Sequence, residues 1–231
     1  MRIPAVCLAA GSGSRLGRAK PSAELVPGMP LGAAVVRALA GAGYGPVIVV
    51  VRPGDDLAWL GTLPDGMPVR PVVCGDASAG MSRSIRCGVR SALEDGEPPD
   101  AILIALADMP FLAPGKLAEW RAAWMLEPGR DFVAGRRGGL VLPPVLWSRR
   151  RFGDLLRLEG DAGAGALLRS GRLRGAWVEL TGFEGFDPDT PEQFEEARAV
   201  WQAVMRVHDA QSPRDAFSGK ANSMSCKLTR F

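Results

Sequence analysis

The sequence predicts an α/β fold of the three-layer, doubly wound, Rossmann-like type with a mostly parallel central sheet. Short apolar runs alternate along the chain with longer amphipathic stretches, which is the pattern of βαβ units. Two of the runs, 47–51 and 101–105, are apolar at every position and indicate strands covered on both faces. A glycine-rich segment follows the first run, at the end of the strand where such sheets bind ligands.

The individual elements follow from the same periodicity. The strand candidates are residues 3–8, 47–51, 69–73, 101–105 and 176–180. The helix candidates are residues 31–42, 82–93, 114–125, 162–170 and 191–207. Pro114 and Pro191 fit a first helical turn, and Thr190 with Gln193 forms a capping-box pattern. The alternation of apolar and polar residues is lost from His208 onward. We therefore expect one domain over 1–207 and a poorly ordered tail over 208–231.

Composition excludes several classes of protein. The net charge of +3 is too small to argue for nucleic acid as a partner. The four cysteines form no Cys-x-x-Cys pair and only one histidine is present, which disfavours a zinc site. No apolar run approaches the roughly 20 residues that cross a bilayer, and no signal peptide is visible. We therefore expect a cytoplasmic protein with neither a nucleic-acid nor a membrane partner.

The segment 8–20 reads Leu-Ala-Ala-Gly-Ser-Gly-Ser-Arg-Leu-Gly-Arg-Ala-Lys. Its glycines let backbone N–H groups approach an anion, and Arg15 and Lys20 supply positive charge. The spacing matches neither Gly-x-Gly-x-x-Gly nor the P-loop pattern, so a common dinucleotide fold and a P-loop ATPase are disfavoured. The alternative is an ordinary Gly/Ser turn. The two cations favour binding of a polyphosphate.

Acidic residues follow two later elements. Asp108 comes directly after the apolar residues 102–107 and stands before Met109-Pro110, which points its carboxylate into the crevice at the strand ends. Carboxylates in such places hold Mg²⁺ beside a triphosphate, although a turn or cap role is the alternative for Asp108. Asp187 or Asp189 completes this metal site if the chain folds back to Asp108; otherwise this stretch is only a helix start.

A third segment, 80–88, begins Gly-Met-Ser-Arg-Ser and opens an amphipathic helix. Ser82 and Ser84 offer hydroxyl groups to a ligand, with simple N-capping by Ser82 as the alternative. A nucleophilic serine is disfavoured, because the one histidine lies in the weakly patterned C-terminal region.

In this order the segments resemble the nucleotidyltransferases with a Rossmann-like GT-A fold. The resemblance is greatest to the molybdenum cofactor cytidylyltransferase branch of the MobA-like nucleotidyltransferase family. It is carried by 8–20, by Gly-Met-Ser-x-Ser at 80–84, by Asp-Met-Pro at 108–110 and by Asp-x-Asp-Thr-Pro-Glu at 187–192. It covers about residues 3 to 205, and the combination is more specific than any one motif.

The resemblance implies a reaction in which the phosphate of molybdenum-loaded molybdopterin attacks the α-phosphorus of CTP and pyrophosphate leaves. It also implies Mg²⁺ as cofactor and a xanthine-dehydrogenase-type molybdenum hydroxylase as client. The implied catalytic residues are Arg15, Lys20 and Asp108, and the implied metal ligands are Asp108 and Asp189. The implied nucleotide-binding residues are Leu8, Ala9, Ala10, Gly11, Ser12, Gly13, Arg15, Lys20, Gly80, Ser82 and Ser84. Ala10, where guanylyl-transferring relatives tend to have glycine, favours a pyrimidine nucleotide.

The part of the chain that the resemblance assigns to binding the acceptor departs from the family pattern. Pro143 stands where the family often has histidine or asparagine, and Gly165 stands where it often has a cation. Three alternatives therefore remain beside the cytidylyltransferase. They are a pyrimidine nucleotidyltransferase for a sugar or alditol phosphate, an accessory protein that delivers the pterin cofactor without transfer, and a non-catalytic α/β domain.

Overall fold

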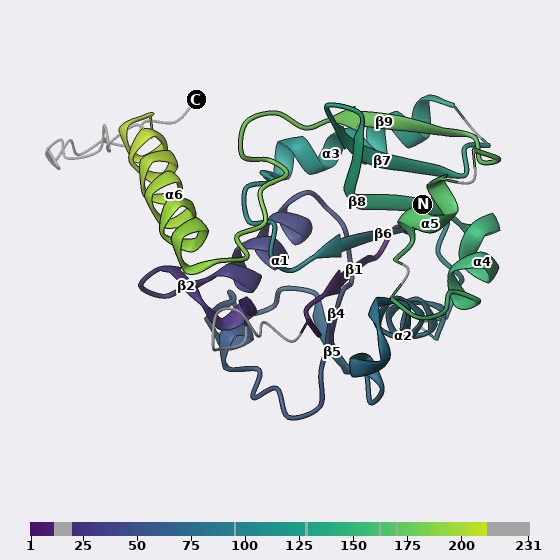
Figure 1. Ribbon diagram of the computed structural model, residues 1–231, viewed down its shortest axis with the longest axis horizontal. Coiled ribbons are helices and arrows are strands. Elements are labelled where there is room, and N and C mark those ends of the chain that lie inside the picture. The colour runs from purple at the N-terminus through teal and green to yellow at the C-terminus, as the bar shows by residue number, and fades with distance from the viewer. Residues whose placement is uncertain (12–19, 95, 128, 162, 170, 212–231) are drawn as a thin grey trace, which may run out of the picture.

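A computed structural model describes residues 1–11, 20–94, 96–127, 129–161, 163–169 and 171–211 (Figure 1). The described part holds a seven-stranded sheet in the order β5-β4-β1-β6-β8-β7-β9. The strands of this sheet are β1 (Ala5–Leu8), β4 (Val47–Val51), β5 (Val69–Val73), β6 (Ala101–Leu106), β7 (Phe132–Arg137), β8 (Leu140–Ser148) and β9 (Gly175–Glu179). Only β8 runs antiparallel to its neighbours, which confirms the predicted mostly parallel sheet.

Helices cover both faces of this sheet. The described helices are α1 (Leu31–Gly41), α2 (Met81–Leu93), α3 (Pro114–Leu126), α4 (Phe152–Leu156), α5 (Gly165–Arg169) and α6 (Pro191–Gln211). A two-stranded ribbon of β2 (Glu24–Val26) and β3 (Met29–Pro30) precedes α1, and α6 packs against it. None of the described helices combines the length and the apolar character of a membrane span.

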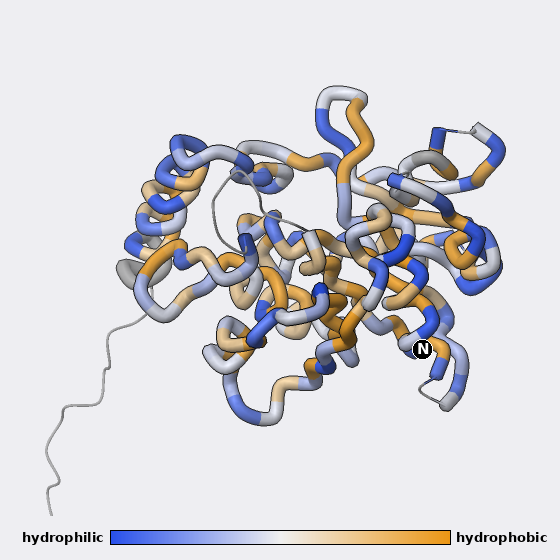
Figure 2. The backbone as a smooth tube through the Cα atoms, turned by 60° about the horizontal axis from the view of Figure 1, so that its bottom comes forward, coloured by the Kyte–Doolittle hydropathy of each residue, from blue (hydrophilic) through white to orange (hydrophobic). Residues whose placement is uncertain are grey.

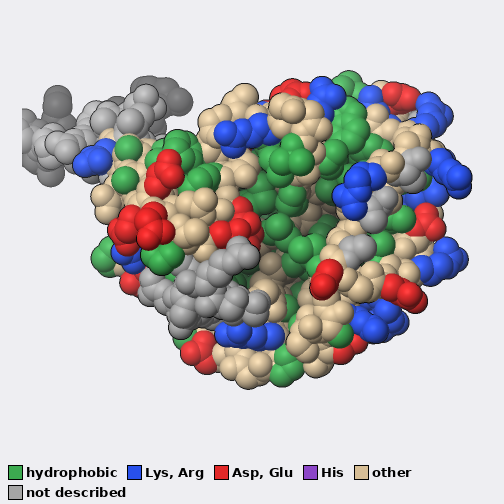
Figure 3. Space-filling model, in the orientation of Figure 1, with side chains coloured by type: hydrophobic (Ala, Val, Ile, Leu, Met, Phe, Trp, Pro, Cys, Tyr) green, Lys and Arg blue, Asp and Glu red, His purple; other side chains and the backbone are tan. Residues whose placement is uncertain are grey.

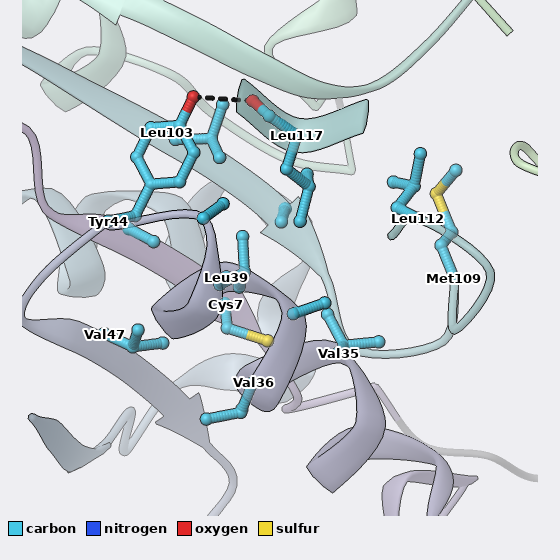
Figure 4. Packing of buried hydrophobic residues seen from close by; sticks show 14 of the residues in the cluster. Cys7, Val35, Val36, Leu39, Tyr44, Val47, Leu103, Met109, Leu112 and Leu117 are labelled. Atoms are coloured by element: carbon cyan, nitrogen blue, oxygen red, sulfur yellow. Dashed lines mark hydrogen bonds between the residues drawn. The ribbon is translucent and has the colours of Figure 1, made fainter. Parts of the chain in front are cut away.

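Alternate residues of each strand face opposite sides of the sheet and belong to different hydrophobic cores. On β1, Ala5 and Cys7 belong to the core beneath α1 and α3, whereas Val6 belongs to the core beneath α2 and α4. Figure 4 shows the first core, in which the Tyr44 hydroxyl donates a 3.0 Å hydrogen bond to the carbonyl of Leu117 in α3. In Figure 2 the backbone is orange through the centre of the molecule, where the buried strands lie. The chain is therefore a three-layer α/β structure, as predicted.

All five predicted strands and all five predicted helices have counterparts. The strands 47–51 and 69–73 have the predicted ends, and the ends of the other elements are shifted. The first strand begins at Ala5 instead of residue 3, and the last helix runs on to Gln211 instead of ending at 207. The predicted helix 162–170 is shorter, at Gly165–Arg169. The prediction missed β2, β3, β7, β8 and α4.

One glycine fixes the distance between α2 and the sheet. A Cβ atom on Gly88 would lie 2.3 Å from Val6 Cγ1 and 3.0 Å from Val50 Cγ2. We expect Gly88→Ala to lower the free energy of unfolding by about 1–3 kcal/mol, because α2 must move away from β1. Urea unfolding measures this, with Gly115→Ala in α3 as the matched control. Gly115 is exposed, with nothing within 4 Å of its added Cβ. A Gly88→Ala protein as stable as the control would contradict the close packing.

Asp131 holds together three strands at the far edge of the sheet. Its carboxylate accepts hydrogen bonds from Arg151 Nε and the Arg174 backbone N–H, both at 2.9 Å, and its backbone carbonyl accepts one from Ser148 N. Burial opposes the charge, but these bonds hold the pKa of Asp131 below its usual range. The charged carboxylate of Asp131 therefore stabilises the folded state at pH values above its unfolded pKa of about 4. This stabilisation is lost as the pH falls through the lower pKa that Asp131 has in the folded protein.

We therefore expect Asp131→Asn to destabilise the protein at pH 7 by about 1–3 kcal/mol. The difference between variant and wild type should shrink below pH 4, where wild-type Asp131 also becomes neutral. Thermal unfolding between pH 3 and pH 7 checks both points. A constant difference across this range would rule out the charged interaction as its source.

Candidate active site

A cavity of about 910 Å³ opens at the carboxyl ends of four parallel strands. The last residues of β1 and β6, Leu8 and Leu106, line it. The residues that follow the strands also line it: Ala9, Ala10 and Gly11 after β1, Arg52 and Pro53 after β4, Gly75 after β5, and Ala107 and Asp108 after β6. The rest of the lining consists of Lys20, Pro21, Ala77, Ser78, Gly80, Met81, Ser84, Asp161, Asp187 and Asp189. Figure 3 shows one face of the molecule hollowed near its centre, with hydrophobic side chains in the hollow and charged ones around it. The position is the one where doubly wound sheets bind ligands.

Lys20 connects three carboxylates in this cavity. Its ammonium donates hydrogen bonds to Asp108 Oδ2 at 3.1 Å, to Asp189 Oδ1 at 3.0 Å and to Asp187 Oδ1. The Lys20 side chain is only 10% exposed. An ammonium group has three donors, so each donor of Lys20 is directed at one carboxylate.

The electrostatics of this cluster follow from its geometry. Burial disfavours the charge on Lys20, but Asp108, Asp187 and Asp189 outweigh it and raise the pKa of Lys20 to about 12. Burial and the nearby charge of Asp108 raise the pKa of Asp187 to about 6, against the opposing effect of Lys20. The cluster therefore holds a firmly protonated lysine among carboxylates that repel one another.

Several predicted site residues come together here and others do not. The cavity is lined by Leu8, Ala9, Ala10, Gly11, Lys20, Gly80, Ser84, Asp108 and Asp189. Ser82 lies instead beneath the surface, with no exposed area, and its backbone N–H donates to the Gly160 carbonyl at 3.3 Å. Ser12, Gly13 and Arg15 lie outside the described residues.

Gly80 requires the absence of a side chain. Its φ is +119°, and an added Cβ would lie 2.5 Å from the Gly160 carbonyl oxygen. The turn before α2 therefore packs directly against the backbone at Gly160. Through this contact the start of α2 and the segment ending at Asp161 form one wall of the cavity.

The start of α6 holds Asp189 in place. Thr190 Oγ1 accepts a hydrogen bond from Gln193 N at 3.3 Å, and Gln193 Oε1 accepts one from Thr190 N at 3.1 Å. This is the reciprocal capping box predicted from the sequence. Gln193 Oε1 also accepts from Asp189 N at 2.8 Å, so the cap fixes the backbone that carries the carboxylate.

The cavity residues that were not predicted include Arg52, Met81 and Asp161. Arg52 directly follows β4, as Asp108 follows β6, so the strand-end argument could have found it. Met81 lies inside the Gly-Met-Ser-x-Ser segment at 80–84, of which only Gly80, Ser82 and Ser84 were predicted to bind nucleotide.

The carboxylates offer hard oxygen ligands suited to a divalent cation such as Mg²⁺. Asp108 Oδ1 is buried and finds no hydrogen-bond partner among the residues that the structure describes, so one oxygen of this cavity residue is unused there. Across the described ranges, no group of three or more His, Cys, Asp or Glu side chains has the arrangement of a complete metal site. The residues thus suit a cation that takes one or two carboxylates and completes its shell with substrate oxygens, as Mg²⁺ commonly does.

Comparison with known proteins identifies the family of the chain. A family profile described as "MobA-like NTP transferase domain" matches residues 5–176. The chain is 34% identical over 208 residues to the purine catabolism protein PucB of Bacillus subtilis (strain 168), covering 86% of this chain and 98% of that protein.

Two solved structures share the fold. A nucleotidyl transferase from Methanothermobacter matches with a TM-score of 0.72 and 26% identity, over 88% of this chain and 99% of that one. The manganese complex of Rv0371c from Mycobacterium tuberculosis H37Rv matches with a TM-score of 0.67 and 25% identity, over 86% and 98% of the two chains.

Proposed function

Since the chain belongs to the family of MobA-like NTP transferase domains, we propose that it transfers CMP from CTP to the phosphate of molybdenum-loaded molybdopterin. The product is a cytosine dinucleotide cofactor, and pyrophosphate is released. The observation that carries this proposal is the cluster of Lys20 with Asp108, Asp187 and Asp189 at the strand ends. It combines the positive charge that phosphates need with oxygen ligands for a divalent cation.

The reaction asks the protein for position and charge more than for covalent chemistry. A new bond forms between the acceptor phosphate oxygen and the α-phosphorus, while the bond from that phosphorus to the leaving pyrophosphate breaks. The acceptor phosphate is already ionised at neutral pH, so no general base is required. In the proposal the backbone after β1, at Ala9, Ala10 and Gly11, faces the triphosphate.

Asp108 and Asp189 are the proposed ligands of Mg²⁺. When bound, such a cation neutralises phosphate charge and orients the reacting oxygens. The unused oxygen of Asp108 supports this assignment, as does the manganese found with the Rv0371c structure. Asp187 neighbours both ligands and shares Lys20 with them.

Lys20 changes partners during the proposed reaction. All three of its donors face carboxylates, so a hydrogen bond to a phosphate oxygen requires release of at least one of them. In the proposal Lys20 then contacts the β- and γ-phosphates with Arg15, and both stabilise the leaving pyrophosphate. Gly80, Ser82 and Ser84 contribute to the nucleotide site from α2, with Ser82 acting from beneath the surface.

The proposed nucleotide is a pyrimidine, and within that class CTP. Ala10 supports this choice because its methyl group takes room that a purine-binding relative leaves open. The proposed client is a xanthine-dehydrogenase-type hydroxylase, and the name of the Bacillus relative, a purine catabolism protein, agrees with such a client.

Release of pyrophosphate from CTP, UTP, GTP and ATP tests the proposal, with Mg²⁺ and purified molybdenum-loaded molybdopterin as acceptor. We expect release with CTP alone. Release with CTP or UTP only when a sugar or alditol phosphate replaces the pterin would support that alternative acceptor. No release with any nucleotide, despite measurable pterin binding, would favour the accessory delivery protein.

A further inference from the structure

A second cavity, of about 230 Å³, lies between the end of β5 and α2. We call it the cysteine–arginine groove, because two cysteines and three arginines line it. Its lining consists of Cys74, Cys87, Arg83, Arg86 and Arg90 together with Val72, Val73, Gly75, Asp76, Ser91 and Glu94. Nothing in the proposed nucleotidyl transfer uses these two thiols.

The two cysteines are free and adjacent. Both thiols line the groove, and each directs its S–H at an oxygen acceptor. Cys74 is 2% exposed and donates to Asp76 Oδ1 at 3.4 Å, whereas Cys87 is half-buried and donates to the Val73 carbonyl at 3.9 Å. Cys87 is thus the more accessible thiol. Its contact with the carbonyl of Val73, the residue before Cys74, places the two cysteines side by side in the groove.

The arginines make the groove attractive to anions. Arg83, Arg86 and Arg90 are spaced so that they share one side of α2. Arg83 pairs with Asp76 at 3.4 Å, but the buried Nε atoms of Arg83 and Arg86 have no hydrogen-bond partner within the described part of the chain. The three guanidinium groups outnumber the two carboxylates of the groove, Asp76 and Glu94, and the resulting positive charge suits a ligand that carries carboxylates.

We propose that this groove is an oxidation site at which a small anionic disulfide converts Cys74 and Cys87 to an intramolecular disulfide. The Cys87 thiolate attacks one sulfur of the disulfide, forms a mixed disulfide and releases one thiol. The Cys74 thiolate then attacks the Cys87 sulfur and releases the second thiol. The two cysteines lose two electrons and two protons, and the small disulfide gains them. This proposal does not depend on the transferase activity.

The arginines are needed because the thiols are not intrinsically reactive. Burial raises the pKa of Cys74 to about 11, and burial also raises the pKa of Cys87, although Arg90 acts in the opposite direction on Cys87. Little thiolate is present at neutral pH. In the proposal, oxidation of the cysteines is therefore accelerated by a raised local concentration of the anionic disulfide, which the positive charge of the arginines provides.

Full-length Cys226→Ser protein tests the proposal, because Cys226 lies outside the described residues. Glutathione disulfide is the anionic probe, and 2-hydroxyethyl disulfide is the uncharged one. Intact-mass measurement and peptide mapping should show loss of two hydrogens and a Cys74–Cys87 linkage. Adding Cys74→Ser should trap one glutathione on Cys87.

The charge dependence gives the decisive comparison. We expect the Arg86→Gln/Arg90→Gln variant to react at least about fivefold more slowly with glutathione disulfide and at an unchanged rate with the uncharged probe. Circular dichroism confirms that the variant is folded. Equal slowing with both probes, or modification without a Cys74–Cys87 linkage, would overturn the proposal.

Discussion

Replacing Asp108 with asparagine is expected to slow pyrophosphate release by about a hundredfold or more while the fold persists. The substitution keeps the shape of the side chain and removes the charge that a divalent cation requires. It also removes one of three carboxylates that repel one another around Lys20, so little stability should be lost. The rate of release under saturating CTP and acceptor, together with a thermal unfolding curve, measures both quantities.

Asp100→Asn is the matched control for this experiment. Asp100 stands directly before β6, at the opposite end of the strand from Asp108, and accepts a 2.8 Å hydrogen bond from Arg2 N. The control variant should keep wild-type turnover, because Asp100 is far from the strand ends that form the cavity. Wild-type turnover in Asp108→Asn would remove Asp108 from the metal site.

The sequence predicts the parallel half of the fold well because three of its four strands, β1, β4 and β6, consist entirely of apolar residues. Runs such as 47–51 are recognisable without any knowledge of their neighbours. The half of the sheet around the antiparallel strand β8 is harder to predict from the sequence. β8 contains Pro143 and Pro144, residues that argue against a strand, and β7 ends in two arginines. Trp120 of α3 stabilises this region by donating a 2.8 Å hydrogen bond to the Pro144 carbonyl, a contact that no local pattern reveals.

Several residues of the candidate site are predictable one by one, but the sequence leaves their arrangement conditional on how the chain folds back. Asp108 was identified from its place after a strand, and Asp189 from its place before a helix. Their meeting at Lys20 depends on chain separations of 88 and 169 residues, which only the topology of the sheet determines. Lys20 was expected to face phosphate alone, whereas its pairing with carboxylates requires the folded arrangement. The burial of Ser82 beneath Gly160 has the same origin.

Lys20→Met is expected to weaken CTP binding about tenfold or more and to destabilise the protein by about 1–3 kcal/mol. Methionine preserves the length of the side chain but leaves Asp108, Asp187 and Asp189 without their shared cation. Removing one partner of a fully buried ion pair would destabilise the protein more. Here the Asp189 side chain is 52% exposed and the Asp187 side chain 35% exposed, so water screens part of the repulsion. Calorimetric titration with CTP and urea unfolding provide the two measurements.

A second variant separates the two roles of Lys20. In Lys20→Met/Asp187→Asn one of the three carboxylates is neutral, so much of the lost stability should return because the repulsion is smaller. Nucleotide affinity should stay low, since the ammonium that meets the phosphates is still missing. If the double variant recovered affinity together with stability, Lys20 would act only by organising the carboxylates. Recovery of stability alone, with binding still weak, supports direct contact between Lys20 and the nucleotide.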